Sequence, residues 1–306
     1  MSEPKRIALV GVGHWGRFIL RDLKSLGCTV IAIARSEESI QRAKDGGADE
    51  IVDSLDRIGK VDGIVVATPS SLHAESLTPI VELGLPIFVE KPLTVDYASS
   101  RRLTDAAPDR LFVMEKWRYH PGVELMRDIV ASKELGETIG IKATRVRWGN
   151  PHYDVDCIWN LIPHELSIVD EVLGYMPKPR AAVSESIDGV PVSLQALMGN
   201  KPWASVEVSC NEREVRQEVR LICEKGVVKL ADPYAGHVII EHFVESDQEN
   251  PRVELREHSQ EFPLKLELMA FVEHLNGGVA PRASAEQSTR IVAMIEELRK
   301  LAGITC

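Results

Sequence analysis

Three glycines near the start of the chain constrain its fold more than any other feature. Gly11, Gly13 and Gly16 have the spacing G-x-G-x-x-G, and they follow the apolar run of residues 6–12. Such a run is typical of a strand that is buried on both faces of a parallel sheet. A helical pattern begins at His14, so the glycines form the turn between a buried strand and a helix. This arrangement predicts a Rossmann domain with a doubly wound parallel sheet, of class α/β.

The spacing of the glycines suits the binding of a dinucleotide. Gly11 permits the tight turn, Gly13 lets the backbone approach a pyrophosphate, and Gly16 lets the helix pack on the strand. The N-terminus of the helix adds amide donors and a positive partial charge. The three glycines are therefore expected to bind a cofactor, together with the intervening His14 and Trp15. The alternative is a glycine-rich turn that binds nothing.

The rest of the first third alternates between strand and helix patterns. This rhythm predicts a parallel sheet with helices on both faces. The expected strands are residues 28–34, 63–67, 86–89 and 111–114. The expected helices are residues 37–45, 71–83 and 95–106.

The pattern changes near Trp117. After a helix at residues 121–135, strand-like stretches follow one another without helices between them, which predicts an open, mainly antiparallel sheet. These stretches are residues 138–148, 180–187, 192–198, 204–209, 215–223, 227–230 and 238–244. Two final helices are expected at residues 264–275 and 284–303. The chain is thus predicted to have a Rossmann domain at residues 1–119 and an α+β domain at residues 120–306.

The composition excludes several classes of function. The chain has 306 residues, of which 44% are hydrophobic and 27% are charged, as in ordinary globular domains. Its net charge of −10 disfavours binding to nucleic acid or to anionic lipid. No stretch is long and apolar enough to span a membrane, and no signal peptide is expected. The five cysteines form no C-x-x-C pair, which indicates reduced thiols in a cytoplasmic compartment. No cluster has the spacing of zinc ligands, so no metal is expected.

The end of the second strand bears on the choice of cofactor. NAD-binding units commonly carry an acidic residue there, which holds the ribose 2′-hydroxyl. This chain has Ala34 at that position, followed by Arg35 and Ser36. An arginine pairs well with a 2′-phosphate and a serine donates a hydrogen bond to it, so NADP is favoured over NAD. The alternative is that Arg35 is a solvated arginine on the surface.

Three further landmarks follow the glycine motif. They are Thr68-Pro69 with His73, then Glu90-Lys91-Pro92, and then Asn160 with His164. With these landmarks the chain resembles the glucose-fructose oxidoreductase, inositol dehydrogenase and MocA family over essentially its whole length. A Glu-Lys-Pro sequence after a strand, with a histidine downstream, is much more specific than the glycine motif alone.

The resemblance implies where several residues and the second domain act. Thr68, Pro69 and His73 are expected to flank the cofactor. Trp117 and Arg118 belong to a segment that is expected near the nicotinamide. The C-terminal domain is expected to bind a small polyhydroxylated substrate and to assemble the chain into a homodimer or homotetramer.

The chemistry of hydride transfer agrees with the roles that the resemblance implies for the other landmarks. It places Glu90 and Lys91 at the nicotinamide end, with the lysine on the reacting hydroxyl, and it makes His164 the proton acceptor. Removing a hydride from a carbinol carbon leaves a proton to be taken from the hydroxyl. A histidine is a suitable base near neutral pH, and a lysine stabilises the negative charge on the oxygen. Taken alone, Lys91 is as readily a surface lysine and His164 a structural histidine.

Asn160 departs from the family pattern, in which an aspartate commonly stands four residues before the histidine. An asparagine side chain donates and accepts hydrogen bonds but exchanges no proton at neutral pH. Asn160 is therefore expected to orient a hydroxyl rather than to act as the base. If Asn160 and His164 lie on one continuous helix they share a face, whereas Pro163 between them is able to kink that helix.

A polar stretch before Asn160 is expected to line a sugar pocket or, alternatively, to form a polar loop. Its residues are Arg147, Trp148, Asn150, His152, Tyr153 and Asp156. The sequence predicts an NAD(P)-dependent dehydrogenase or reductase acting on a hydroxyl or carbonyl carbon of a sugar, sugar nucleotide or cyclitol. One alternative is a reductase of a different carbonyl or of an imine. Another is a dinucleotide-sensing regulatory or binding protein on the same fold. Asn160 is compatible with that alternative, and the presence of both Lys91 and His164 argues against it.

Overall fold

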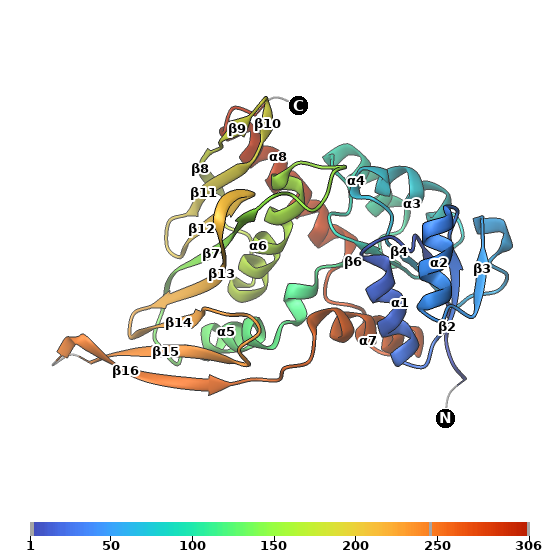
Figure 1. Cartoon of the computed structure of the whole chain (residues 1–306). Coiled ribbons are helices and arrows are strands. Elements are labelled where there is room, and N and C mark those ends of the chain that lie inside the picture. Colours follow the sequence, from blue (N-terminus) through green and yellow to red (C-terminus); the bar gives the residue numbers. More distant parts are fainter. Residues whose placement is uncertain (1–2, 245–246, 305–306) are drawn as a thin grey trace. The chain divides into compact units, whose positions relative to one another are not determined.

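The computed structural model describes residues 3–244 and 247–304, and it divides the chain into two compact units (Figure 1). The Rossmann unit contains Met1–Lys116 and Phe262–Val292. The sheet unit contains Trp117–Glu261 and Ala293–Cys306. This division differs from the predicted one at residue 119, because a segment from late in the chain joins the first unit.

The Rossmann unit is built on a six-stranded sheet with the order β3-β2-β1-β4-β5-β6. Every neighbouring pair is parallel, which confirms the doubly wound sheet. The strands are β1 (Arg6–Val10), β2 (Thr29–Ile33), β3 (Glu50–Val52), β4 (Gly63–Val66), β5 (Ile87–Glu90) and β6 (Leu111–Met114). Only β3 was not expected, because it is three residues long and incompletely buried at the edge of the sheet.

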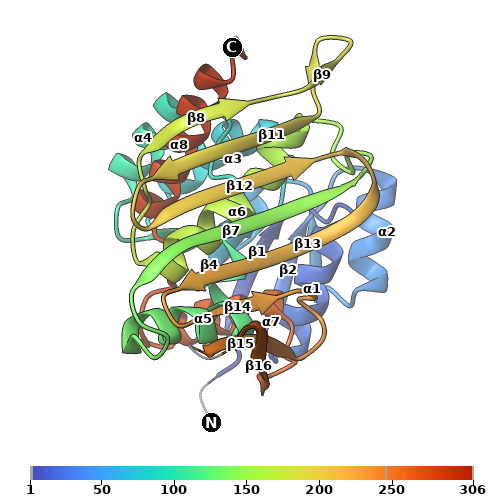
Figure 2. The same ribbon diagram turned by 90° about the vertical axis from the view of Figure 1, so that its left-hand side faces the viewer.

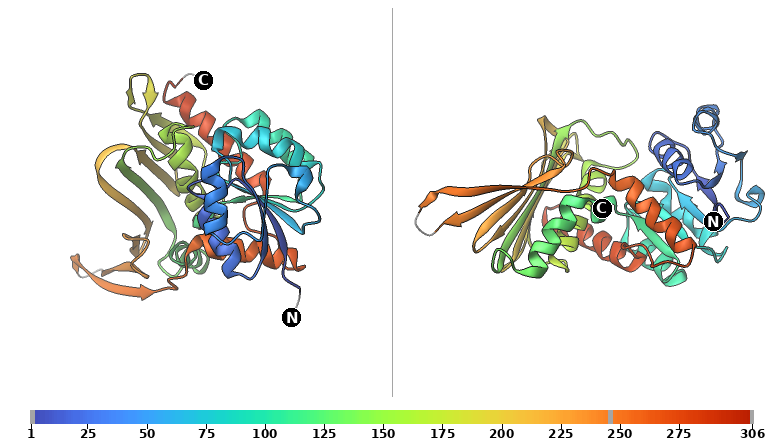
Figure 3. Two further views of the ribbon diagram at one scale, coloured as in Figure 1. Left: turned by 45° about the vertical axis from the view of Figure 1, so that its right-hand side comes forward. Right: turned by 90° about the horizontal axis from the view of Figure 1, so that it is seen from below.

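Helices flank this sheet on both faces (Figure 3). Between the strands lie α1 (Gly16–Ser25), α2 (Glu37–Asp45), α3 (His73–Val81) and α4 (Tyr97–Ala106), with short 3-10 turns η1 (Leu55–Arg57) and η2 (Ser70–Leu72). Two helices from the end of the chain complete the unit: α7 (Pro263–Leu275) and the first part of α8 (Ala285–Leu301). These bounds agree closely with the predicted helices.

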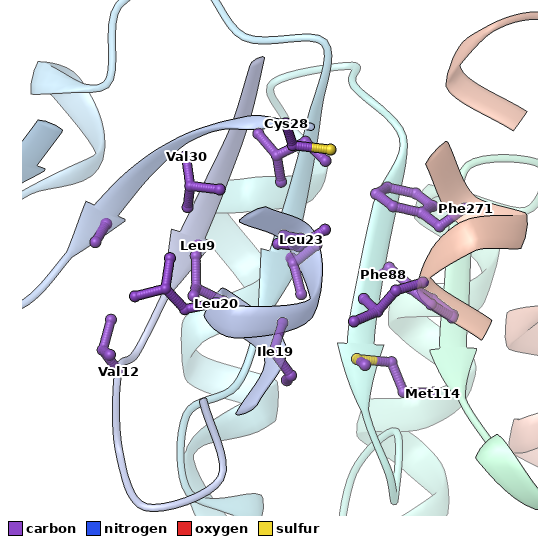
Figure 4. Close-up of a cluster of buried hydrophobic side chains, with 14 of the residues drawn as sticks. Leu9, Val12, Ile19, Leu20, Leu23, Cys28, Val30, Phe88, Met114 and Phe271 are labelled. Carbon is purple, nitrogen blue, oxygen red and sulfur yellow. The ribbon is translucent and has the colours of Figure 1, made fainter. Parts of the chain in front are cut away.

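Helix α7 belongs to the Rossmann unit because its apolar side packs into that unit's core (Figure 4). Phe271 of α7 stacks on Phe88 of β5, with ring centroids 5.0 Å apart. Leu23 of α1 and Leu268 of α7 are fully buried in the same cluster. Full burial of such a side chain contributes about 1.5–3 kcal/mol, so α7 is an integral part of the dinucleotide-binding fold.

The sheet unit contains an eight-stranded sheet with the order β16-β15-β14-β13-β7-β12-β11-β8 (Figure 2). Its strands are β7 (Thr138–Trp148), β8 (Pro179–Val183), β11 (Ser193–Gly199), β12 (Trp203–Ser209), β13 (Asn211–Cys223), β14 (Gly226–Leu230), β15 (His237–Val244) and β16 (Asp247–Glu257). All neighbours are antiparallel except β12 and β7, which run parallel. The predicted strand at residues 180–187 is in fact β8 followed by a small hairpin of β9 (Ser186–Ile187) and β10 (Val190–Pro191).

Two helices, α5 (Pro121–Ser132) and α6 (Cys157–Leu173), cover one face of this sheet, and Figure 2 looks onto the other face. Helix α6 packs on β12, β7 and β11. Alternate side chains of β12, namely Ala204, Val206 and Val208, are fully buried, as expected for a strand with one covered face. A 3-10 turn, η3 (Lys116–Tyr119), begins where the Rossmann unit ends.

Candidate functional site

The three glycines of the G-x-G-x-x-G motif have different steric surroundings. Gly11 adopts φ of +93°, and a Cβ added there would lie 2.8 Å from the carbonyl oxygen of Ala67. A Cβ at Gly16 would collide with the carbonyl oxygen of Gly11. By contrast, a Cβ at Gly13 would meet nothing within 4 Å. The motif therefore packs tightly through Gly11 and Gly16 and leaves free space over Gly13, where a pyrophosphate requires close approach to the backbone.

The N-terminus of α1 is suited to an anion. Its N-cap residue, Trp15, makes no side-chain capping hydrogen bond, and the first turn holds no acidic residue. Helices α2 and α4 differ, because Ser36 and Asp96 cap them with side-chain oxygens. The amide donors and positive partial charge of α1 are thus not used by a cap. Together with the space over Gly13, this shows that the residues present fit a bound dinucleotide.

Arg35 and Ser36 follow the end of β2, and their side chains have different surroundings. The side chain of Arg35 is exposed, and its Nε donates a hydrogen bond to the carbonyl oxygen of Asp53, 3.0 Å away. The hydroxyl oxygen of Ser36 accepts from the backbone N–H of Ser39 and so caps α2. Arg35 therefore projects at the surface beside the start of α2, while the hydroxyl of Ser36 already has a structural partner.

His73 links the two loops that follow β4 and β5. It is fully buried, with Nδ1 2.7 Å from the carbonyl oxygen of Pro92 and Nε2 3.0 Å from that of Thr68. The Thr68 hydroxyl oxygen is buried and has no hydrogen-bond partner among the described residues. A buried hydroxyl in this position is commonly satisfied by a ligand or by water. His73 thus fixes the Thr-Pro loop against the Glu-Lys-Pro loop, with one polar group still to be satisfied.

Glu90 connects the Glu-Lys-Pro loop to the glycine loop. The indole Nε1 of Trp15 donates a short hydrogen bond to Glu90 Oε1, and the backbone N–H of Lys91 donates to Glu90 Oε2 over 3.2 Å. The ammonium of Lys116 lies 4.5 Å from the centroid of the Trp15 ring, a cation–π distance. Since Lys91 directly follows β5 and is partly exposed, these contacts hold it at the same edge of the sheet as the glycine loop.

In the sheet unit, His164 is exceptional within its helix. Every residue of α6 from Cys157 to Val169 is buried except His164, which is partly exposed. The helix is continuous through Pro163, so Asn160 and His164 lie four residues apart on one face. Pro163 lies within α6 and does not end it. The imidazole of His164 is therefore accessible to a substrate from the surface, whereas the side chains around it on the helix are not.

The side chain of Asn160 is held by the side-chain amide of Asn150, a contact that the sequence did not predict. Its Nδ2 donates to Oδ1 of Asn150 over 2.7 Å, and Asn150 Nδ2 in turn donates to the carbonyl oxygen of Val155 over 2.7 Å. Asn150 therefore faces Asn160 with an acceptor. A carboxylate at position 160 has no hydrogen to donate to this acceptor, which gives a structural reason for the asparagine.

Trp117 lies against the imidazole of His164. The two ring centroids are 6.4 Å apart with an interplanar angle of 77°, and His120 stacks on Trp117 at 5.1 Å. The guanidinium carbon of Arg145 lies 4.8 Å from the Trp117 centroid, and Arg145 Nε also donates a short bond to the buried Glu165. Trp117 therefore packs against the side chain of the predicted base, His164.

Arg118 is buried and is paired with two carboxylates of its own unit. It is 1% exposed, and its guanidinium pairs with Asp170 at 2.8 Å and with Glu171 at 3.4 Å, both on α6. These two carboxylates compensate its buried charge without a cofactor. The expected place of Arg118 near the nicotinamide stays a prediction.

The polar stretch before α6 is partly structural. Asp156 caps α6 by accepting from the N–H groups of Ile158 and Trp159, and it pairs with Arg299 at 2.6 Å. Tyr153 is fully exposed, and Trp148 is exposed with Arg213 packed over its ring. The remaining predicted pocket residues are exposed Arg147, partly buried Asn150 and partly exposed His152.

Two further expectations concern ions and membranes. Among residues 3–244 and 247–304, no group of three or more His, Cys, Asp or Glu side chains is arranged to hold a metal ion. Within the same residues, no helix has the length and hydropathy needed to cross a membrane.

The fold and the glycine loop define a dinucleotide-binding α/β protein of two units. Residues 5–113 match the sequence model of the oxidoreductase family with an NAD-binding Rossmann fold. This match lies in the Rossmann unit and agrees with the resemblance to the glucose-fructose oxidoreductase, inositol dehydrogenase and MocA family that the motifs indicated.

Relatives and solved structures extend this similarity over most of the chain. The chain is 24% identical over 255 residues to an inositol 2-dehydrogenase of Corynebacterium glutamicum, which covers 76% of this chain and 75% of the relative. Its fold is similar to that of UDP-N-acetylglucosamine 3-dehydrogenase from Acidithiobacillus ferrooxidans, with a TM-score of 0.84, 21% identity and 98% of each chain covered. It is also similar to that of a levoglucosan dehydrogenase in complex with NADH and levoglucosan, with a TM-score of 0.86, 16% identity and 98% of each chain covered.

Proposed function

We propose that this chain is an NAD(P)-dependent dehydrogenase or reductase that acts on a hydroxyl or carbonyl carbon of a sugar, sugar nucleotide or cyclitol. The observation that carries the proposal is the contact between Trp15 of the glycine loop and Glu90 of the Glu-Lys-Pro loop. It holds Lys91 beside the loop that fits a dinucleotide. Relatives in the same family are named for oxidation of inositol, of a UDP-sugar and of levoglucosan.

We assign the chemistry to three side chains and a bound cofactor. A bound nicotinamide supplies or accepts the hydride. Lys91 stabilises the negative charge that develops on the substrate oxygen. His164 accepts the hydroxyl proton in oxidation and returns it in reduction. Asn160 orients the substrate hydroxyl through its amide.

For the cofactor we propose binding by the glycine loop, by the Thr-Pro loop that His73 fixes, and by Glu90. Gly11, Gly13 and Gly16 provide the turn and the close approach, and His14 and Trp15 lie between them. At the other end of the dinucleotide we propose that exposed Arg35 pairs with a 2′-phosphate and that Ser36 assists it, so NADP(H) is preferred. Two observations support this preference: position 34 is an alanine and not an acidic residue, and the side chain of Arg35 is exposed.

We further propose that the chain forms a homodimer or homotetramer through the sheet face that α5 and α6 do not cover. This face is mixed in character. At its centre, Glu207 accepts from Gln195 at 3.1 Å and from Thr144 at 3.4 Å. Leu197 and Leu255 are 41% and 62% exposed. Leu255 has exposed apolar neighbours, Val253 on the same strand and Phe243 on the paired strand β15, and a group of exposed apolar side chains supports an interface.

The decisive experiment is a panel of sugars, sugar nucleotides and cyclitols offered with NAD+ and with NADP+, followed through the absorbance of the reduced nicotinamide. We expect turnover with at least one member. Tight cofactor binding with no turnover across the panel, in both directions, would instead indicate the dinucleotide-sensing alternative.

A further inference from the structure

Helix α7 carries a carboxyl group that the proposed chemistry does not use. Glu267 is 1% exposed. The described residues place no hydrogen-bond partner on either oxygen of its side chain. An ionised carboxylate that is buried without a partner costs several kcal/mol, so such a group is normally neutral.

Two more carboxyl groups and one ammonium lie around Glu267 and act on it electrostatically: Glu90 at the end of β5, and Glu115 and Lys116 after β6. Glu115 is 3% exposed and accepts a hydrogen bond from Ser288 Oγ over 2.6 Å. Of the two lysines near this group, Lys116 acts on both Glu90 and Glu267, whereas Lys91 acts on Glu90. Like charges in a common buried site favour retention of a proton on one of them.

The hydrogen bonds decide which carboxyl group holds that proton. Glu90 accepts from the indole of Trp15 and the backbone of Lys91, and Glu115 accepts from Ser288. Burial raises the pKa of Glu90 too, but the ammonium groups of Lys91 and Lys116 and the hydrogen bonds from Trp15 and Lys91 favour its ionised form. Glu267 has none among the described residues. Burial raises the pKa of Glu267 well above its ordinary value, Glu90 and Glu115 raise it further, and Lys116 opposes them.

We propose that Glu267 is a positioning residue that stays a neutral carboxylic acid and so keeps Glu90 ionised, as the acceptor of the Trp15 indole and the neighbour of Lys91. An ionised Glu267 adds a second negative charge beside Glu90 and favours transfer of the proton to Glu90. A protonated Glu90 is a weaker acceptor for Trp15. The protonation state of Glu267 therefore controls the strength of the hydrogen bond between Trp15 and Glu90, which joins the glycine loop to the Glu-Lys-Pro loop. Only the consequence for Lys91 rests on the proposed function.

The first test locates the proton without substrate or cofactor. Infrared spectroscopy of the wild-type protein near neutral pH is expected to show the carbonyl band of a protonated carboxylic acid, and Glu267→Gln is expected to remove it. Glu273→Gln, on the exposed side of the same helix, is the matched control and keeps the band. A band that survives in Glu267→Gln and disappears in Glu90→Gln would overturn the assignment, as would a wild type with no such band.

The second test uses stability. Because the folded-state pKa of Glu267 is raised, the stability that its proton confers is complete below its unfolded pKa and is lost as the pH rises through the folded pKa. Glutamine needs no proton. The melting temperature of Glu267→Gln relative to wild type is therefore expected to rise between about pH 5 and about pH 8. A constant difference contradicts the proposal. Glu267→Met, which is neutral and similar in volume, serves the same comparison if the glutamine variant does not accumulate.

The third test reads the link to Glu90 through cofactor affinity. Wild-type affinity for NADPH, measured by protein fluorescence, is expected to fall by about tenfold above the pKa of Glu267, which corresponds to a coupling of about one pKa unit. Glu267→Gln is expected to keep its affinity over the same range. Equal pH dependence in both proteins overturns the positioning role. The infrared and melting readouts need neither cofactor nor turnover, so they separate failure of this inference from failure of the proposed function.

Discussion

The imidazole of His164 meets the indole of Trp117 nearly at right angles, with ring centroids 6.4 Å apart. Trp117 is itself buried between neighbours of the sheet unit, among them Arg145. Perpendicular aromatic pairs of this kind contribute about 0.5–1.5 kcal/mol beyond the area they bury. The tryptophan therefore restricts the orientation of the one partly exposed side chain between Cys157 and Val169 of α6.

Replacing Trp117 tests this restriction. Trp117→Leu is expected to lower kcat by about 2-fold to 10-fold, which corresponds to loss of the ring pair. Trp117→Phe keeps an aromatic edge and is expected to lose less. Tyr175→Leu, at an exposed aromatic residue of the same unit to which no role is assigned, is the control and is expected to change nothing. Steady-state kinetics at saturating cofactor decide the matter, and equal kcat for Trp117→Leu and wild type would rule out the orienting role.

Lys91→Met is expected to abolish most turnover while cofactor still binds. The lysine is proposed to act on the reacting oxygen and not on the pyrophosphate. Loss of one such electrostatic donor lowers the rate by a factor of about 10² to 10³. Lys60→Met, at an exposed lysine of the Rossmann unit, is the control. If Lys91→Met turns over within a few-fold of wild type, Lys91 has no place in the mechanism.

Much of the Rossmann unit was predictable because its strands are continuous apolar runs with glycine turns. Residues 37–45 and 111–114 were predicted with the bounds that the structure shows for α2 and β6. The membership of α7 was not predictable, since Phe271 lies far along the chain from its partner Phe88. Strand β16 was missed because it is an edge strand that carries charged residues such as Arg252 and Arg256, a common feature of protected edges.

The candidate site shows the same limit. The glycines, Lys91 and His164 were found because their residue types and spacings carry chemistry by themselves. The partner of Asn160 was not, because Asn150 stands ten residues away in a loop whose shape no periodicity specifies. The burial of Glu267 was hidden as well, since a glutamate on an amphipathic helix is usually solvated. Pairwise contacts of polar residues across loops require the tertiary structure.

The choice of cofactor is tested at Arg35. A hydrogen bond to a charged group contributes about 1.5–3 kcal/mol, so Arg35→Ala is expected to weaken NADP(H) binding by about 10-fold or more. Affinity for NAD(H), which has no 2′-phosphate, is expected to stay within a few-fold. Fluorescence titration of both cofactors gives the comparison, with Arg42→Ala as the control. Wild-type protein that binds NAD(H) as tightly as NADP(H) would refute the preference.

The oligomer is tested by light scattering at micromolar concentration. We expect at least twice the chain mass of 34.0 kDa. Leu255→Glu places a charge on the open face of the sheet and is expected to shift the population towards monomer, because burial of an unpaired charge is costly. Val279→Glu, at an exposed valine of the Rossmann unit, is expected to leave the mass unchanged. A wild-type monomer would contradict the proposal outright.

Asn160→Asp tests the coupling of the two polar residues on α6. Oxidation needs a neutral His164. An aspartate four residues away on the same face favours the imidazolium and raises the pKa of the histidine by about one unit. Since a raised pKa keeps the ring protonated to higher pH, the acidic limb of the oxidation pH–rate profile is expected to move upward by about the same amount.

The structure adds a cost to this substitution and supplies its control. Asn150 Oδ1 accepts a hydrogen bond from the side chain at position 160. An aspartate there loses this hydrogen bond and places its carboxylate oxygen against Asn150 Oδ1, so that two acceptors face each other. We expect about 1–3 kcal/mol of destabilisation, visible as a lower melting temperature. Asn160→Leu loses the same bond without adding charge, and its acidic limb should stay in place. An unmoved limb in Asn160→Asp would show that the two residues do not couple. A limb that persists in His164→Asn would show that another group is the titrating base.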